Sequence, residues 1–167
     1  MRNYLLKFVK LFSFFERYGV IYAIFGDSAM YIWGIRKKLR YIEIIIDFDE
    51  ENIKRFLKLM LNMGMKIKGN IKYKFLPDIL KKRDKIEVDY LIFYHRRILP
   101  WRIKLFLKEN LCRYKVVEKK LEDTKIYVLS SEDVFNLKMR DINLRSLQDI
   151  HFLRAKLKDV FERAFSK

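Results

Sequence analysis

The strongest constraint on the fold is the alternation of apolar and polar side chains over residues 41–48. The apolar side chains, three of them isoleucine, fall on one face of an extended segment, whereas Glu43 and Asp47 fall on the other. The same period of two recurs over residues 85–93, and residues 20–25 form a short apolar run. We expect these three segments to be strands of one mixed sheet, with residues 41–48 directly beside residues 85–93.

Apolar side chains at three- and four-residue spacing predict helices elsewhere in the chain. The expected helices are residues 3–18, 29–33, 50–62, 100–111, 130–140 and 144–165, with a helical turn at residues 77–82. Hairpins are expected at residues 65–75 and at residues 113–129, the latter turning at Glu122–Asp123. Asp49 is expected to cap the helix that follows it, and Ser130 with Asp133 resembles a capping box.

These elements predict an α+β fold, a mixed sheet covered by helices with a helical C-terminal third. The length suits one domain over residues 1–167. Its core sheet and helices are expected in residues 1–95, and a helix, a hairpin and the C-terminal helices in residues 96–167.

The net charge of +16 comes from 37 basic and 21 acidic residues, and most of the excess lies after residue 50. This balance favours anionic partners, namely nucleic acid, a nucleotide or an acidic partner protein. A lysine-rich proteome, such as that of a thermophile, is the alternative explanation. If the charge is functional, nucleic-acid affinity should fall steeply as the salt concentration rises.

The composition also excludes several classes of protein. A hydrophobic content of 51% argues against disorder, and the single cysteine, Cys112, excludes a disulfide scaffold and a cysteine-rich zinc module. The apolar runs are too short for a membrane span or a signal peptide, so we expect no membrane contact and a cytoplasmic location. The two histidines, His95 and His151, give no metal-ligand spacing.

Residues 22–48, which read YAIFGDSAMYIWGIRKKLRYIEIIIDF, resemble the start of the nucleotidyltransferase superfamily, the polymerase-beta-like fold. The likeness is to its small AbiEii-type or minimal branches, in which a glycine turn, a short helix and a basic loop precede a strand bearing Asp-x-Asp. Residues 129–150 resemble the later helices of that family, with Lys138 and Asp149 at matching positions.

The resemblance implies transfer of a nucleotide from a nucleoside triphosphate to RNA or protein, with Mg²⁺ as the cofactor. Glu43 and Asp89 would then hold the metal, and Glu87 would assist them. The residues implied to contact the substrate are Gly26, Asp27, Ser28, Arg36 and Lys138.

The sequence departs from the family pattern where catalysis needs it most. Tyr41 stands at the position of the first metal carboxylate, and a phenol with a pKa of about 10 is a poor replacement. Asp27 is an anion in the turn that would hold phosphates, and Leu39 replaces a Thr or Ser. We therefore expect a degenerate site, weakly active or inactive, that binds nucleic acid, a nucleotide or a partner protein. An active, divergent Mg²⁺-dependent enzyme is the alternative.

Two further alternatives concern the carboxylates. Asp47 and Asp49 form a literal Asp-x-Asp in another register, although a helix cap explains Asp49 better. If the two patterned strands pair, Glu43 lies about 5 Å from Glu87 or Asp89. The competing interpretation is a solvated face whose carboxylates pair with lysines. The substrate, the partner and the oligomeric state are left open by the sequence.

Overall fold

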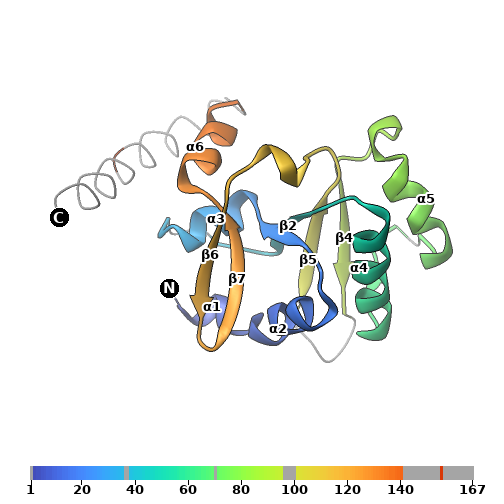
Figure 1. Cartoon of the computed structure of the whole chain (residues 1–167), viewed down its shortest axis with the longest axis horizontal. Coiled ribbons are helices and arrows are strands. Elements are labelled where there is room, and N and C mark those ends of the chain that lie inside the picture. The colour runs from blue at the N-terminus through green and yellow to red at the C-terminus, as the bar shows by residue number, and fades with distance from the viewer. Residues whose placement is uncertain (1, 36–37, 70, 96–100, 141–154, 156–167) are drawn as a thin grey trace.

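The computed structural model describes residues 2–35, 38–69, 71–95, 101–140 and residue 155. Its described part is an α+β structure built on a seven-stranded mixed sheet with the strand order β3-β4-β5-β2-β1-β7-β6 (Figure 1). The strands are β1 (Tyr22–Ile24), β2 (Ile42–Ile46), β3 (Lys66–Ile67), β4 (Tyr90–Tyr94), β5 (Arg102–Phe106), β6 (Val116–Leu121) and β7 (Thr124–Leu129). The predicted fold class is confirmed.

Helices connect these strands and cover the sheet. They are α1 (Arg2–Leu6), α2 (Val9–Tyr18), α3 (Gly26–Ile32), α4 (Glu50–Asn62), α5 (Leu76–Lys81) and α6 (Ser131–Arg140). Short 3-10 turns add η1 (Tyr73–Phe75), η2 (Arg83–Lys85) and η3 (Leu111–Arg113).

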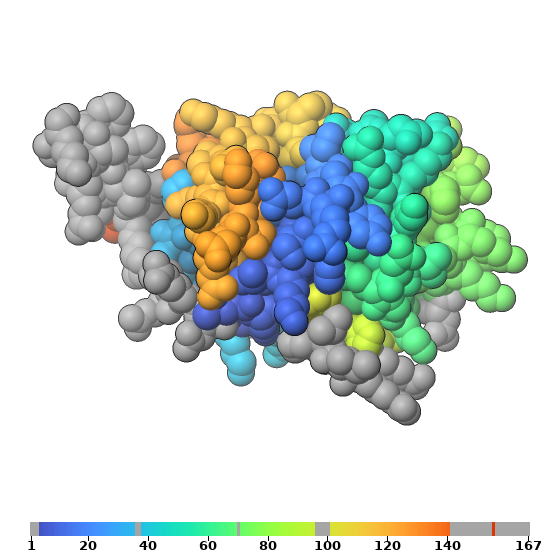
Figure 2. Space-filling view, turned by 60° about the horizontal axis from the view of Figure 1, so that its bottom comes forward, coloured from blue at the N-terminus to red at the C-terminus, as the bar shows by residue number. Residues whose placement is uncertain are grey.

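One face of the sheet is an apolar layer that α2 and α4 cover. Ile44 of β2 pairs in register with Ile24 of β1 and with Leu105 of β5, and Ile42 pairs with Ile103, so these side chains share this face. Phe15 of α2 and Phe56 of α4 pack 6.2 Å apart between ring centroids. Figure 2 shows α2 lying between the β6–β7 hairpin and α4, and α2 contacts both β7 and α4.

The opposite face carries the polar side chains of β2 and its neighbours. Glu43 of β2 lies opposite Lys104 of β5, and Lys104 lies opposite Ile92 of β4. Helix α3 packs against β2 and β7, and α6 packs against α3. This face therefore brings charged side chains together beside the start of α3.

Several predicted elements are confirmed. Asp49 caps α4 by accepting hydrogen bonds from the backbone amides of Glu51 (2.9 Å) and Asn52 (3.0 Å). The hairpin β6–β7 turns at Glu122–Asp123. Ser130 Oγ accepts from the amide of Asp133 at 3.1 Å and donates to its carboxylate at 2.9 Å, which completes the predicted cap of α6.

Other predictions are wrong. Residues 102–106 form strand β5 and not part of a helix, because Trp101, Ile103, Leu105 and Leu107 are buried at every second position. The strand predicted at residues 85–93 begins only at Tyr90, because residues 83–85 form the turn η2. Strand β5 lies between β2 and β4, so the strands predicted to be direct neighbours share a sheet without pairing.

Two smaller corrections concern the segments before α2 and β4. The first helix is divided into α1 and α2 at residues 7–8. Residues 65–75 do not form a hairpin, because β3 pairs with β4 and η1 follows it. The predicted helix at residues 144–165 falls outside the described residues, apart from residue 155. In the described part of the chain, every helix is too short or too polar to cross a bilayer.

Candidate functional site

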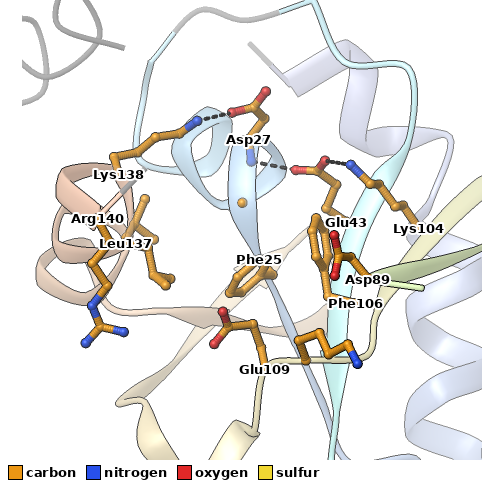
Figure 3. A pocket seen from close by; sticks show the side chains of 13 residues that line it. Phe25, Asp27, Glu43, Asp89, Lys104, Phe106, Glu109, Leu137, Lys138 and Arg140 are labelled. Carbon is orange, nitrogen blue, oxygen red and sulfur yellow. Dashed lines mark hydrogen bonds and ion pairs between the residues drawn. The ribbon is translucent and has the colours of Figure 1, made fainter. Parts of the chain in front are cut away.

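A cavity of about 480 Å³ opens on the polar face of the sheet, where β2, β4 and β5 meet α3 and α6 (Figure 3). Four basic and four acidic side chains stand around two phenylalanine rings. The lining residues are Phe25, Gly26, Asp27, Glu43, Asp89, Lys104, Phe106, Lys108, Glu109, Val134, Leu137, Lys138 and Arg140. The cavity thus contains five of the eight residues that the sequence singled out: Gly26, Asp27, Glu43, Asp89 and Lys138.

Both carboxylate oxygens of Glu43 are engaged by partners within the chain. Oε2 accepts a hydrogen bond from the backbone amide of Asp27 at 2.6 Å, and Oε1 lies 3.3 Å from Nζ of Lys104. The side chains of Glu43 and Lys104 are only 13% and 20% exposed, so water screens this pair poorly. The negative charge of Glu43 is therefore compensated by a lysine on the neighbouring strand.

The ammonium group of Lys104 is held on three sides. Besides Glu43, it lies 4.3 Å from the ring centroid of Tyr90 and 4.7 Å from that of Phe106. Aromatic faces attract a cation at these distances. Glu43 and the two rings thus hold the Lys104 ammonium at the position where Glu43 would otherwise bind a metal.

Gly26 allows Glu43 to approach the start of α3. Its φ of +56° lies in the left-handed region, and a Cβ placed there would come within 2.4 Å of Glu43 Oε2. In the resembled family this turn is expected to approach phosphates. Here the turn makes its close approach to a carboxylate of the same chain.

Asp27 and Lys138 join α3 to α6. Lys138 Nζ lies 3.2 Å from Asp27 Oδ1, with the two side chains 22% and 41% exposed (Figure 3). The ion pair brings together two of the residues predicted to contact the substrate. Their charges neutralise one another, however, and neither is presented alone to a ligand.

Ser28 has a structural role that differs from its predicted one. Its buried hydroxyl accepts from the amide of Glu43 at 2.9 Å and donates to the carbonyl of Tyr41 at 3.2 Å. Ser28 therefore fastens α3 to the start of β2 and does not line the cavity. Tyr41 is also absent from the cavity lining, so it does not fill the position of a missing ligand there.

Of the two other predicted carboxylates, Asp89 lies in the cavity and Glu87 lies outside it. Asp89 lines the cavity at the start of β4, and no hydrogen bond or ion pair to its carboxylate occurs among the described residues. Glu87 is exposed and lies outside the cavity lining. The residue opposite Glu43 is Lys104, so the predicted pairing of Glu43 with Glu87 or Asp89 across adjacent strands is wrong. Arg36 lies outside the described residues.

The lower wall of the cavity is fixed by two further contacts. Lys108 Nζ donates to the backbone carbonyls of Arg83, at 2.8 Å, and Ile86. The hydroxyl of Tyr114 donates a hydrogen bond to the carboxylate of Glu109. Burial, followed by the hydrogen bond to Glu109 and the charge of that carboxylate, raises the pKa of the Tyr114 hydroxyl well above its usual value. Tyr114 is thus a neutral hydrogen-bond donor at neutral pH.

These residues do not fit the Mg²⁺ site that the resemblance implies. Mg²⁺ needs hard oxygen ligands in near-octahedral geometry, and both oxygens of Glu43 already have partners. Within the described part of the chain, no group of three acidic, histidine or cysteine side chains is placed to hold a metal. Among the described acidic residues that line the cavity, only Asp89 has a carboxylate with no hydrogen-bond or ion-pair partner in the described part of the chain.

The alternative Asp-x-Asp register fits no better. Asp49 caps α4, and Asp47 Oδ1 accepts a hydrogen bond from the Asp49 amide at 3.3 Å. Neither residue lines the cavity. Both are explained by the start of a helix.

Sequence reasoning missed Lys104, the residue that decides the electrostatics of the site. The signal was present in the alternation of Trp101, Ile103, Leu105 and Leu107, which indicates a strand with Lys104 on its polar face. The pairing of Lys104 with Glu43 depends on the order of the strands in the sheet, and the alternation does not reveal that order.

Comparison with known proteins leaves the family unassigned. No family model matches the chain, and neither a curated protein nor a solved structure matches it.

Proposed function

We propose that this chain is a nucleotidyltransferase-like domain that binds a nucleotide in its cavity and does not transfer it. One observation carries the proposal, namely that Lys104 and the Asp27 amide occupy both oxygens of the Glu43 carboxylate. The site keeps the glycine turn and the strand carboxylate that suggested the family, but a lysine holds the carboxylate.

The Lys104 ammonium explains why transfer is not expected. Nucleotidyl transfer commonly uses two metal ions about 3.5–4 Å apart, bridged by carboxylates. A metal at Glu43 would have to displace an ammonium that also contacts two aromatic rings, and would stand close to that positive charge. Repulsion between the two cations in a poorly screened site opposes metal binding.

The size and lining of the cavity support a nucleotide as its ligand. A volume of about 480 Å³ lies in the range of small-molecule sites. The rings of Phe25 and Phe106, whose centroids are 4.8 Å apart, offer an apolar surface for a base. Arg140 stands in the wall that α6 contributes, where a guanidinium is suited to contact phosphates, whereas Lys138 is paired with Asp27.

Titration of a fluorescent ATP analogue, in EDTA and then in excess Mg²⁺, tests the proposal. We expect saturable binding of similar affinity in both buffers, weakened by Phe106→Leu and unchanged by the matched control Phe14→Leu, since half-buried Phe14 lies on α2 and outside the cavity. Binding that requires Mg²⁺, or no binding at all, would contradict it.

The active enzyme is the second candidate, and Asp89 is the observation that favours it. Its carboxylate lines the same cavity as Glu43 and has no partner among the described residues. Labelled nucleoside triphosphates, Mg²⁺ or Mn²⁺, and total RNA or cell extract should give no transfer if our proposal is correct. Robust transfer that disappears in Glu43→Ala would establish the enzyme in its place.

A further inference from the structure

A second feature lies outside the cavity, on the outer side of α4. Residues 71–85, which we call the basic flank, comprise η1, α5 and η2 and form one edge of the molecule (Figure 1). Six of these fifteen residues are basic and two are acidic. The flank therefore contributes a net charge of +4 in a short stretch of chain.

Most of this positive charge is available to a partner. Lys81 pairs with Glu50 at 3.3 Å, and the Arg83 guanidinium lies 4.2 Å from the ring centroid of Phe48. The other basic residues of the flank are exposed, and no ion pair to them occurs in the described part of the chain. These residues are Lys72, Lys74, Lys82 and Lys85.

The basic flank also carries an exposed aromatic ring beside one of these lysines. Phe75 is 51% exposed, and Lys74 Nζ lies 4.9 Å from its ring centroid. Exposing a phenylalanine has no benefit for folding, because burial of its ring would stabilise the fold. An open ring beside cations is the combination by which proteins bind unpaired bases and their phosphates.

The flank is anchored firmly enough to present this surface. Leu76 and Leu80 are fully buried, and the Tyr73 hydroxyl donates to the carbonyl of Met65 at 2.6 Å. Lys108, which lines the cavity, holds the carbonyl of Arg83 at 2.8 Å. One end of the flank is thus tied to the cavity wall.

We infer that the basic flank is a binding surface for single-stranded nucleic acid, with Phe75 stacking on a base and the surrounding lysines contacting phosphates. The inference does not depend on nucleotide binding in the cavity, because the flank lysines and Phe75 are not cavity residues. A membrane surface is less suited to it, because η1 and α5 together expose one large apolar ring and no continuous apolar face.

The test is fluorescence anisotropy of a short, labelled, single-stranded RNA with the full chain. The flank variant is Lys74→Glu/Lys82→Glu. The control, Lys115→Glu/Lys120→Glu, makes the same charge change on two exposed residues, one in β6 and one directly before it, at the other end of the sheet. Equal urea midpoints would show that both variants fold as the wild type does.

We expect the flank variant to lose at least tenfold in affinity at roughly 50 mM salt, and the control to lose less than threefold. The slope of log affinity against log salt should become shallower by roughly 1.4 in the flank variant, since each phosphate contact contributes about 0.7 on a single strand. Phe75→Ala should weaken binding by about fivefold or more, and Phe75→Trp should restore it and report the base by fluorescence quenching.

Equal losses in the two charge variants would show that only the general positive field acts, and would overturn the inference. So would an unchanged affinity in Phe75→Ala, or binding to phosphatidylserine vesicles without binding to RNA. Because the ATP analogue is titrated separately, failure of the flank leaves the cavity proposal standing, and the converse also holds.

Discussion

At the scale of single residues, the site depends on contacts that leave no room for substitution. Gly26 combines a positive φ with the close approach of Glu43 Oε2. Any other residue there would have both a strained backbone and a Cβ that clashes with Glu43. Gly69 offers a natural comparison, because its φ of +94° is also positive and nothing lies within 4 Å of its missing Cβ. The two glycines separate backbone strain from side-chain displacement.

Gly26→Ala should lower the free energy of unfolding by at least about 2 kcal/mol, because the left-handed backbone alone costs about 1–2 kcal/mol for a non-glycine residue. Gly69→Ala should cost only that backbone strain. In a Glu43→Ala background the cost at Gly26 should shrink toward the Gly69 value. Urea unfolding of the two single variants and the double variant measures this coupling. An equal cost of Gly26→Ala in both backgrounds would show that Glu43 does not occupy the space.

At the scale of elements, the sequence predicted those features that depend on residues close together in the chain. The Asp49 cap, the β6–β7 hairpin and the cap of α6 each depend on a few neighbouring residues, and each is confirmed. The four-residue spacing of Ile103, Leu107 and Leu111 predicts a helix where strand β5 lies, and it competes with the alternation that ends at Leu107. The Glu43–Lys104 pair needed the strand order, which joins residues sixty-one positions apart.

Asp49→Ala separates the cap from the alternative metal register. We expect it to lower the free energy of unfolding by about 1 kcal/mol, because two amides at the start of α4 lose their acceptor. Asp84→Ala is the matched control, because the exposed Asp84 side chain makes no hydrogen bond or ion pair with any described residue. Unchanged stability together with reduced affinity for Mn²⁺ would restore Asp47 and Asp49 as metal ligands.

At the scale of the whole molecule, buried phenols predict how stability depends on pH. Burial, followed by the charges of Glu43 and Tyr31, raises the pKa of Tyr4 to about 12. Burial is also the largest cause that raises the pKa values of Tyr22, Tyr73 and Tyr114. An unfolded tyrosine has a pKa of about 10, so the folded state binds more protons above that pH.

The stabilising contribution of these tyrosines is therefore complete below about pH 10 and is lost as the pH rises through their folded pKa values. Urea midpoints should fall from about pH 10 upward, and the fall should be smaller in Tyr4→Phe. That substitution should cost little at neutral pH, because the buried Tyr4 hydroxyl has no hydrogen-bond partner among the described residues. An identical pH profile in wild type and Tyr4→Phe would contradict the assignment.

The order of the strands in the sheet is also a property of the whole molecule. The sheet places the basic flank and the β6 edge at opposite ends, which is why a charge change can be compared between them within one chain. It also places Lys104 beside Glu43, which the account of the cavity depends on. Neither arrangement follows from composition.

The most direct test of the central claim is a Mn²⁺ titration, followed by the electron paramagnetic resonance of the free ion, on wild type, Glu43→Gln and Lys104→Gln. If Lys104 neutralises Glu43, wild type and Glu43→Gln should bind Mn²⁺ equally weakly, and Lys104→Gln should bind it more tightly than either. Tight binding by the wild type that disappears in Glu43→Gln would contradict the account, because Glu43 would then be a metal ligand despite its lysine partner.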